Sequence, residues 1–365
     1  MYKSLLIPIL FVLASLGLLN FSEAAPSCKT LFKQIDDLNV AIEPTDLLFG
    51  PEWTFTNEKM INASENIPSD VVNKVNQKAL ADWLQHLKSQ QKYRFEILKD
   101  SRYGTDLIRI FDLDGWWVQI SMDPGVIEVH AKPSTKETFL KKKNFIEETV
   151  FIQAKAFGLN PHRHEGSGHI HLSFSHFNTY LHFRNFLVDL YNHDFLFSQI
   201  LVDKPRSGAT PLSAMPAEFQ RRLSNILAEV DLLQLADQQK MILLASRIQN
   251  EVYTDTIGLG ISKSDAYKYQ AINLSRIVDN AVDFKDKTIE LRGIRPQKNL
   301  QEFFLEIEMF QKRVAYVGEF KEFITYDEVN HMGGMWDWML FEKYEDYLKQ
   351  IGLFSPTYVN LNRKR

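Results

Sequence analysis

Alternation of apolar and polar residues predicts a series of short strands along this chain. The segment from Phe49 to Thr56 has polar residues at nearly every second position. As a strand, it would place Glu52 and Thr54 on the face opposite Trp53. Strands of the same kind are predicted at residues 93–98, 106–112, 116–122, 126–130 and 288–294.

Helical spacing of apolar residues predicts helices between these strands. The predicted helices cover residues 70–91, 136–157, 177–194, 217–251, 265–278 and 300–316. Because strands and helices interleave irregularly, the pattern favours an α+β fold over a doubly wound parallel sheet. No repeat or linker divides the chain, so residues 26–365 are expected to form one domain.

Residues 1–25 have the features of a secretory signal peptide. Lys3 is followed by an apolar run from Leu5 to Leu19, and small residues suited to cleavage lie at 22–25. Since a helix needs about 20 apolar residues to span a bilayer, we expect cleavage rather than a stable membrane anchor. The mature chain is therefore expected to be periplasmic or secreted.

Composition narrows the classes of partner. The formal net charge of -4 argues against a general nucleic-acid-binding protein. Cys28 is the only cysteine, which rules out an intramolecular disulfide and a metal cluster held by cysteines. A hydrophobic content of 45% is ordinary for a globular protein and provides for a core of normal size.

The most informative short segment is Gly166–Ser173, in which a His-x-His pair follows a Gly-Ser-Gly turn. In a strand, His169 and His171 share one face. Such a pair can present two imidazoles to one metal ion or to one phosphate. A zinc site of three histidines would need a further ligand, for which His130 and His176 are the candidates.

Three carboxylates on predicted strands are further candidates. Glu52, Glu128 and Glu290 lie among alternating apolar residues, where a carboxylate is costly unless it is paired or binds a cation. Arg292 shares a face with Glu290, and a guanidinium there suits a phosphate or a substrate carboxylate. Ion pairs with lysine or arginine would also explain these residues, so both interpretations stay open.

The order of these motifs resembles the amidoligase family, a group of carboxylate–amine ligases in the glutamine synthetase superfamily. The motifs are Gly-x-Glu at 50–52, Glu-Val before a proline at 128–133, Gly-x-x-His with His-x-His at 166–171, Tyr-x-x-x-Asn-Leu at 269–274 and Ile-Glu-x-Arg at 289–292. The resemblance covers about residues 47–315 and leaves 316–365 as a C-terminal helical extension.

The resemblance implies a curved, mainly antiparallel sheet that forms a funnel-like site backed by helices. Mg²⁺ or Mn²⁺ ions would bridge the phosphates of ATP there. Arg292 and His171 would contact ATP, and Glu290 and Arg295 would join Arg292 as catalytic residues. The implied metal ligands come from four segments: Glu52, Glu128, Glu290 and either His169 or His171.

The implied reaction joins a small-molecule or peptide carboxylate to an amine. The carboxylate attacks the terminal phosphate of ATP, and the amine then attacks the resulting acyl phosphate. Metal ions and arginines neutralise the charge that develops on the transferred group.

Two features conflict with this interpretation. Thr54 stands where the family has a second glutamate, and an exported protein meets little ATP. The alternatives are a catalytically impaired amidoligase-like binding protein and a metal-dependent hydrolase that uses His169 and His171. The hydrolase would lack a His-Glu-x-x-His helix.

Overall fold

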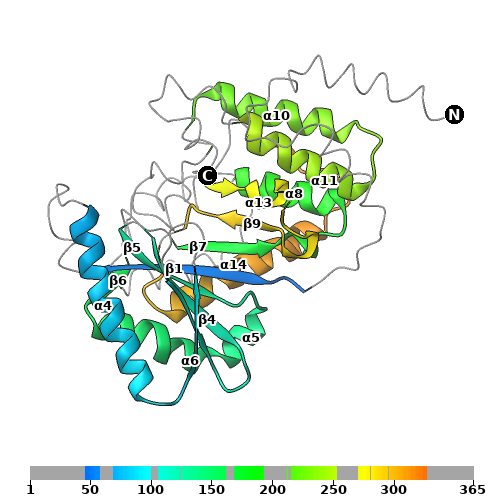
Figure 1. Ribbon diagram of the computed structural model, residues 1–365. Helices are drawn as coiled ribbons and strands as arrows, with labels where there is room; N and C mark the ends of the chain where they lie inside the picture. The colour runs from blue at the N-terminus through cyan, green and yellow to red at the C-terminus, as the bar shows by residue number, and fades with distance from the viewer. Residues whose placement is uncertain are drawn as a thin grey trace, which may run out of the picture.

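The chain forms a mixed α and β structure around one open sheet (Figure 1). The computed structural model describes residues 46–57, 69–99, 106–123, 125–161, 168–192, 212, 215–252, 270–279, 281–294 and 296–326. In these ranges nine strands lie in the order β2-β3-β4-β5-β1-β7-β9-β8, with β6 paired to β1. Their bounds are β1 (Phe49–Asn57), β2 (Arg94–Lys99), β3 (Asp106–Phe111), β4 (Trp117–Asp123), β5 (Val126–Ala131), β6 (Leu159–Pro161), β7 (His169–Ser173), β8 (Ile272–Asn273) and β9 (Thr288–Leu291).

Every strand pairing in the described residues is antiparallel. The expected α+β class with a mainly antiparallel sheet is therefore confirmed. The expected curvature is not found: the sheet is an open, uncurled layer that ends at β2 on one side and at β8 on the other. The strand β1 is central, because β5 pairs along one of its edges and β7 along the other.

Helices cover one face of the sheet and one end of it (Figure 1). The helical elements between β1 and β7 in the sequence are α4 (Ser69–Ser89), α5 (Lys136–Lys141), α6 (Lys143–Ile146), the π-helical turn η1 (Glu147–Phe151) and α7 (Ile152–Ala156). The later elements are η2 (Phe174–His176), α8 (Tyr180–Asn192), α10 (Ala217–Asp231), α11 (Asp237–Arg247), η4 (Ile248–Val252), α13 (Ser275–Val278), η6 (Phe284–Asp286) and α14 (Leu300–Gly318).

The core forms where the apolar side of β1 meets these helices. Trp53 packs edge-on against Phe151 of η1 and Phe303 of α14, at ring-centroid distances of 5.3 and 5.4 Å. Phe55 packs edge-on against Trp83 of α4 at 6.5 Å. These contacts follow from the alternation in β1, since Trp53 and Phe55 both point away from Glu52. The opposite side of the sheet, which we call the site face, carries the polar residues.

Two of the predicted helices are wrong. The predicted helix 217–251 is two helices, α10 and α11, because the chain turns after Asp231, whose backbone carbonyl accepts a 2.9 Å hydrogen bond from Lys240 Nζ. This turn allows the apolar faces of α10 and α11 to pack against each other. The predicted helix 265–278 lies partly outside the described residues. Its described part contains the strand β8, which pairs with β9, before the short helix α13.

The remaining predicted elements agree with the structure in type, and their ends differ by a few residues. The predicted helix 136–157 is the nearly continuous run from α5 to α7. The predicted signal peptide, Cys28 and residues 327–365 lie outside the described residues. No helix in the described ranges is long and apolar enough to cross a membrane.

A buried ion pair joins α8 to α14. Asp189 and Arg313 are 3% and 4% exposed, and Arg313 Nε donates to Asp189 Oδ2 over 3.0 Å. Because loss of one partner leaves a buried charge, Asp189→Ala should lower the free energy of unfolding by about 3–5 kcal/mol. Urea denaturation measures this.

The exposed Lys78–Asp82 pair of α4 provides the control for this change. Lys78→Ala should cost less than about 1 kcal/mol, because exposed ion pairs contribute little. Equal losses in the two variants would contradict the assignment of Asp189 and Arg313 to the core.

Candidate functional site

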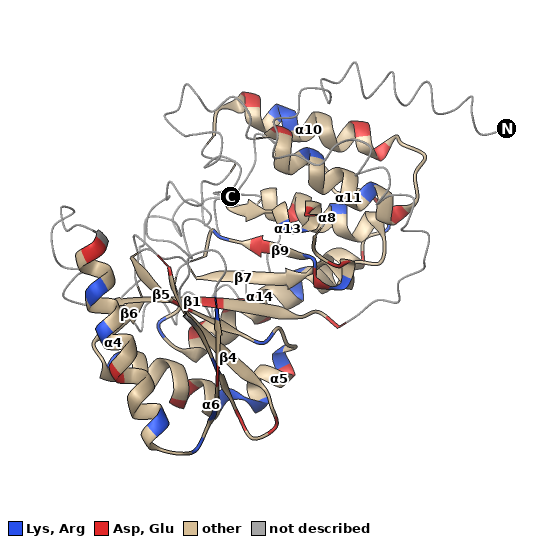
Figure 2. Cartoon of the chain, viewed as in Figure 1, with Lys and Arg blue, Asp and Glu red and all other residues tan. Residues whose placement is uncertain are grey.

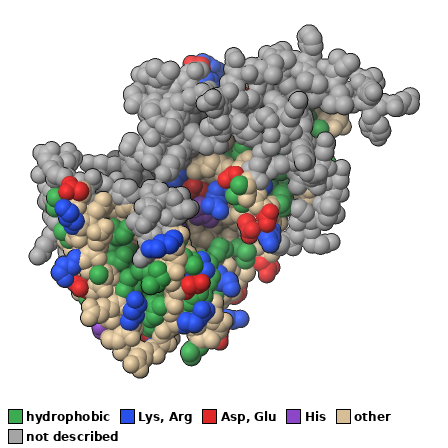
Figure 3. Space-filling model, in the orientation of Figure 1, with side chains coloured by type: hydrophobic (Ala, Val, Ile, Leu, Met, Phe, Trp, Pro, Cys, Tyr) green, Lys and Arg blue, Asp and Glu red, His purple; other side chains and the backbone are tan. Residues whose placement is uncertain are grey.

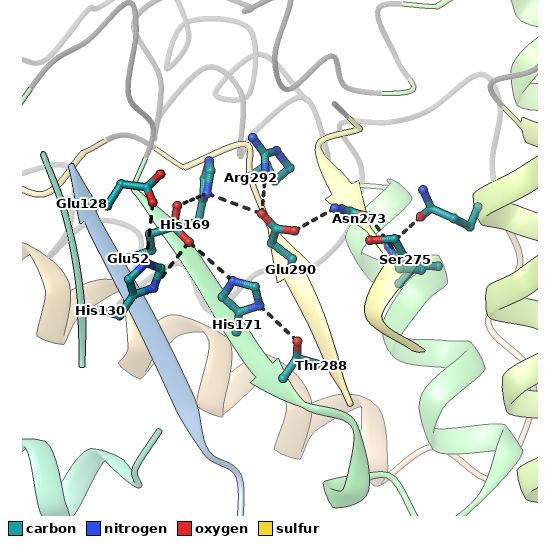
Figure 4. Close-up of polar contacts among 12 residues, drawn as sticks. Glu52, Glu128, His130, His169, His171, Asn273, Ser275, Thr288, Glu290 and Arg292 are labelled. Carbon is teal, nitrogen blue, oxygen red and sulfur yellow. Dashed lines mark hydrogen bonds and ion pairs between the residues drawn. The ribbon is translucent and has the colours of Figure 1, made fainter. Parts of the chain in front are cut away.

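The candidate site lies in the middle of the site face, where β5, β1, β7 and β9 run side by side (Figure 4). The register places Glu52 directly opposite His130 on one neighbour and His169 on the other. Residues that face each other in this way have Cβ atoms about 4.5–5.5 Å apart. Glu290 is likewise opposite His171. The sheet therefore brings together residues that are far apart in the sequence.

A string of alternating acids and bases crosses these strands (Figure 4). Glu128 Oε2 lies 3.6 Å from His130 Nε2, and His130 Nδ1 lies 3.7 Å from Glu52 Oε2. His169 Nδ1 lies 2.9 Å from Glu52 Oε1 and 3.4 Å from Glu290 Oε1. Each histidine thus lies between two carboxylates from different strands.

Arg292 completes the string beyond Glu290. Its guanidinium donates to Glu290 Oε1 over 2.5 Å. The other oxygen of Glu290 accepts a 2.7 Å hydrogen bond from Asn273 Nδ2, and Asn273 Oδ1 in turn accepts from the backbone N–H of Ser275. The carboxylate of Glu290 is therefore held from two sides.

His171 faces the same carboxylates as His169, as the period-two rule predicts. Its Nε2 lies 3.8 Å from Glu52 Oε2, and its Nδ1 lies 3.0 Å from Thr288 Oγ1. Gly50 is directly opposite His171 in β1, and a Cβ atom at this glycine would lie only 3.4 Å from the Cβ of His171. The glycine of the Gly-x-Glu motif therefore lies against the start of the His171 side chain.

The charged neighbours change the pKa values of the buried carboxylates. Burial raises the pKa of Glu52, but the charge of His169 and hydrogen bonds from His169 and His171 outweigh it, so the pKa lies well below its ordinary value. Burial also raises the pKa of Glu290, but the charges of Arg292, His171 and His169 together outweigh it, so the net shift is downward. Both residues are therefore ionised at neutral pH.

Glu128 behaves differently. Burial raises its pKa, and the negative charge of Glu52 adds to this effect, while His130 only partly compensates. The end of the string at β5 therefore has an excess of negative charge. In Figure 3, a histidine and charged side chains are visible in a hollow near the middle of the molecule.

The donor atoms of this cluster suit a divalent cation. Carboxylate oxygens are the ligands that Mg²⁺ and Mn²⁺ prefer, and one imidazole is compatible with Mn²⁺. The uncompensated charge at Glu128 is also what a bound cation would neutralise. Within the described residues, however, no group of three or more histidine, cysteine, aspartate or glutamate side chains has metal-holding geometry. The carboxylates are paired with histidines and Arg292 instead.

The structure places most of the predicted site residues together. Glu52, Glu128, His169, His171, Glu290 and Arg292 all belong to the cluster. Arg295 lies outside the described residues. His130, considered only as a third zinc ligand, lies between two carboxylates. His176 lies elsewhere, with its ring 5.9 Å from that of His182.

Two contributors to the cluster were not predicted as site residues. The sequence pattern places Asn273 in the Tyr-x-x-x-Asn-Leu motif and within a predicted helix, whereas its strand pairing brings it opposite Glu290. Thr288 opens the strand that carries Glu290, and its position two residues before Glu290 was a signal that it shares that face.

No protein-family model matches the chain, and no curated protein matches it. The resemblance to amidoligases therefore rests on the motif residues themselves.

The raised pKa of Glu128 predicts an unusual effect on stability. A group whose pKa is higher in the folded than in the unfolded state favours folding at low pH, and this contribution is lost as pH rises through the folded pKa. Glu128→Gln should therefore raise the free energy of unfolding at pH 7. The gain should shrink as pH falls towards 4, because the wild-type carboxyl then takes up a proton. Chemical denaturation over this pH range measures both effects.

Glu148 provides a control of opposite sign. Hydrogen bonds from Lys92 and Tyr93 lower its pKa. Glu148→Gln should therefore lower stability at pH 7. A Glu128→Gln variant that is less stable than wild type at pH 7 would contradict the assigned charge excess.

Proposed function

We propose that this chain is an exported ATP-dependent carboxylate–amine ligase of the amidoligase type. The observation that carries the proposal is the contact string Glu52–His169–Glu290–Arg292, whose members come from three motifs far apart in the sequence. Carboxylates that can hold Mg²⁺ and a guanidinium beside them are groups that phosphoryl-transfer sites use, and the imidazole adds a possible metal ligand. In this proposal the sheet is that of a glutamine synthetase-like catalytic domain, and its site face forms the floor of the funnel.

Glu52, Glu128 and Glu290, with His169 or His171, would hold Mg²⁺ or Mn²⁺. A bound ion would supply charge neutralisation at the phosphates of ATP. The oxygens of these carboxylates face one another across neighbouring strands, so a cation would replace some of the present histidine contacts.

Arg292 has the clearest role among the residues that would act without a metal ion. It lies beside Glu290 at the edge of the string, where its side chain is 11% exposed. From there it would donate hydrogen bonds to the transferred phosphoryl group and stabilise its developing charge. Asn273 positions Glu290, because it donates to the carboxylate oxygen that Arg292 does not bind.

The attack on the acyl phosphate requires an amine that has lost its proton. His171 is one group in the described part of the site that could accept it, and its ring is held by Thr288 of β9. Glu290 is a second candidate, held by Asn273 of β8, and its pairing with Arg292 makes it the weaker base. The substrates would be a small-molecule or peptide carboxylate and an amine. The features of residues 1–25 support export, and the ligase would act where ATP is supplied outside the cytoplasm of the producing cell.

One observation favours a second candidate, an amidoligase-like binding protein without turnover. Thr54 is 2% exposed and lies directly opposite Glu128, so the position of the absent second glutamate is part of the site. Without that carboxylate, the site has one fewer ligand for a cation near β5. Turnover and metal affinity distinguish the two candidates.

Turnover tests the ligase directly. With ATP, Mg²⁺ or Mn²⁺ and mixtures of amino acids and short peptides, the exported chain should release ADP. Hydroxylamine in place of the amine should give a hydroxamate, because it traps an acyl phosphate. Glu290→Gln and Arg292→Gln should each reduce ADP release by about 100-fold or more.

Matched controls come from an exposed pair on α10, Glu218 and Arg222. Glu218→Gln and Arg222→Gln should leave turnover unchanged. Failure of every acid and amine pair to yield ADP, despite binding of nucleotide, would favour the binding protein. Absence of nucleotide binding as well would remove both candidates.

Metal affinity gives a second, independent test. Titration of Mn²⁺ followed by electron paramagnetic resonance should show binding that Glu52→Gln weakens at least about tenfold, the effect of losing even an indirect partner of a metal. Thr54→Glu should strengthen binding, because it adds a carboxylate opposite Glu128. Glu218→Gln again serves as the control.

A Glu52→Gln variant with unchanged Mn²⁺ affinity would contradict the assigned ligands. Retention of one tightly bound zinc ion, lost in a His169→Ala variant, would favour the metal-dependent hydrolase instead.

A further inference from the structure

A second group of charged residues lies on the site face, on the strands beyond β5. We call Arg94, Arg109, Phe111, Trp117 and Gln119 the arginine–aromatic patch. The guanidinium carbon of Arg109 lies 4.5 Å from the ring centroid of Trp117, and that of Arg94 lies 3.6 Å from that of Phe111. Both distances are in the range of cation–π contacts, which hold a flexible arginine in one orientation.

The patch is continuous with the candidate site. Glu96 is opposite Arg109, Arg109 is opposite Gln119, and Gln119 is opposite His130. His130 is opposite Glu52 in turn. Because directly opposed residues of an antiparallel sheet share a face, one row of polar side chains crosses from β2 to the catalytic carboxylates.

The guanidinium of Arg109 has capacity left for a ligand. One terminal nitrogen donates to Gln119 Oε1 over 2.9 Å, and the other lies 3.7 Å from the 42%-exposed carboxylate of Glu96. Its Nε is buried and has no acceptor among the described residues, so a ligand would contact the two terminal nitrogens. The side chain remains 26% exposed, so a molecule on the site face can reach it.

Charge differs between the two ends of this row. The site has three carboxylates and one guanidinium, that of Arg292. The patch has two guanidinium groups, with the exposed carboxylate of Glu96 beside it. Figure 2 shows acidic segments within β1, in the middle of the sheet, and within β9, next to the edge strand β8. A molecule laid across the strands would therefore meet cationic groups at the β2–β3 end.

We propose that the arginine–aromatic patch binds a second carboxylate, at the far end of the acid substrate. This inference rests on the proposed ligase function and names its substrate class. Arg109 on β3 is three strand spacings from Glu52 on β1, or about 14 Å at roughly 4.8 Å per spacing. An extended peptide of about four residues spans that distance. The acid substrate is therefore an oligopeptide with one carboxylate at the reaction centre and another at Arg109.

A carboxylate fits the patch better than a nucleobase does. A base would need an open aromatic face on which to stack, and the rings of Phe111 and Trp117 each have an arginine stacked on them. The fork of a guanidinium instead matches the two oxygens of a carboxylate. The hydrogen bond from Arg109 to Gln119 fixes the orientation of this guanidinium group.

Binding without turnover tests this assignment. The exported chain, labelled with ¹⁵N at its tryptophan indoles, would be titrated with tetraglycine and with tetraglycine amide, in the absence of ATP and metal. The signal of Trp117 is identified by its loss in Trp117→Phe. Tetraglycine should shift this signal in a saturable way, and the amide should bind at least about tenfold more weakly.

Arg109→Gln should weaken tetraglycine binding to the level of the amide, whereas Arg222→Gln on α10 should leave it unchanged. Equal responses to acid and amide, or no response to either, would overturn the proposal. A Trp117 shift with ADP but not with tetraglycine would also overturn it and assign the patch to nucleotide. Because the titration needs no ATP or turnover, its failure is distinguishable from failure of the ligase assay.

Discussion

Carboxylates buried side by side on a sheet repel one another, and this structure tolerates three of them because a base lies between each neighbouring pair. His130 separates Glu128 from Glu52, and His169 separates Glu52 from Glu290. The members come from β5, β1, β7 and β9, so the string exists only in one register. A shift of the pairing register by one residue would move the acidic or basic side chains of a whole strand from the site face to the apolar core. The electrostatics of the site and the pairing of the sheet are therefore mutually dependent.

Much of this arrangement was visible in the sequence, for a physical reason. The side-chain period of a strand is two, so the face of each acid and histidine followed from its neighbours in the chain. The order of the strands in the sheet could not be predicted in this way. Nothing in the local pattern of β1 indicates that β5 and β7 flank it, because strand order depends on how the helices pack. The resemblance of the motifs supplied that information indirectly.

The wrong predictions have a related cause. The turn between α10 and α11 has no glycine or proline, so local signals favoured one long helix. In the structure the chain forms two helices, because their apolar faces pack against each other. In the same way, the sequence pattern predicts a helix at Ile272 and Asn273. In the structure they form a strand instead, because they pair with the edge of β9 that β7 does not occupy. Asn273 becomes a site residue only through that pairing.

Stability and site chemistry conflict most clearly at β5. At neutral pH the ionised carboxylate of Glu128 lowers the stability of the folded state, because burial disfavours its ionised form. A sequence selected only for stability would pair the negative charge of a buried carboxylate fully with positive groups. Functional sites commonly keep such groups, because the same excess attracts a substrate or a cation.

The central place of β1 also determines when the site can exist. Glu52 and His169 are 117 residues apart in the chain, and Arg292 follows much later still. Pairings of such high contact order form slowly, because long loops must close first. A growing chain therefore contains the first acid long before its partners. The string of acids and bases can form only after synthesis has passed the last strand, so the order of the strands makes assembly of this cluster a late step in folding.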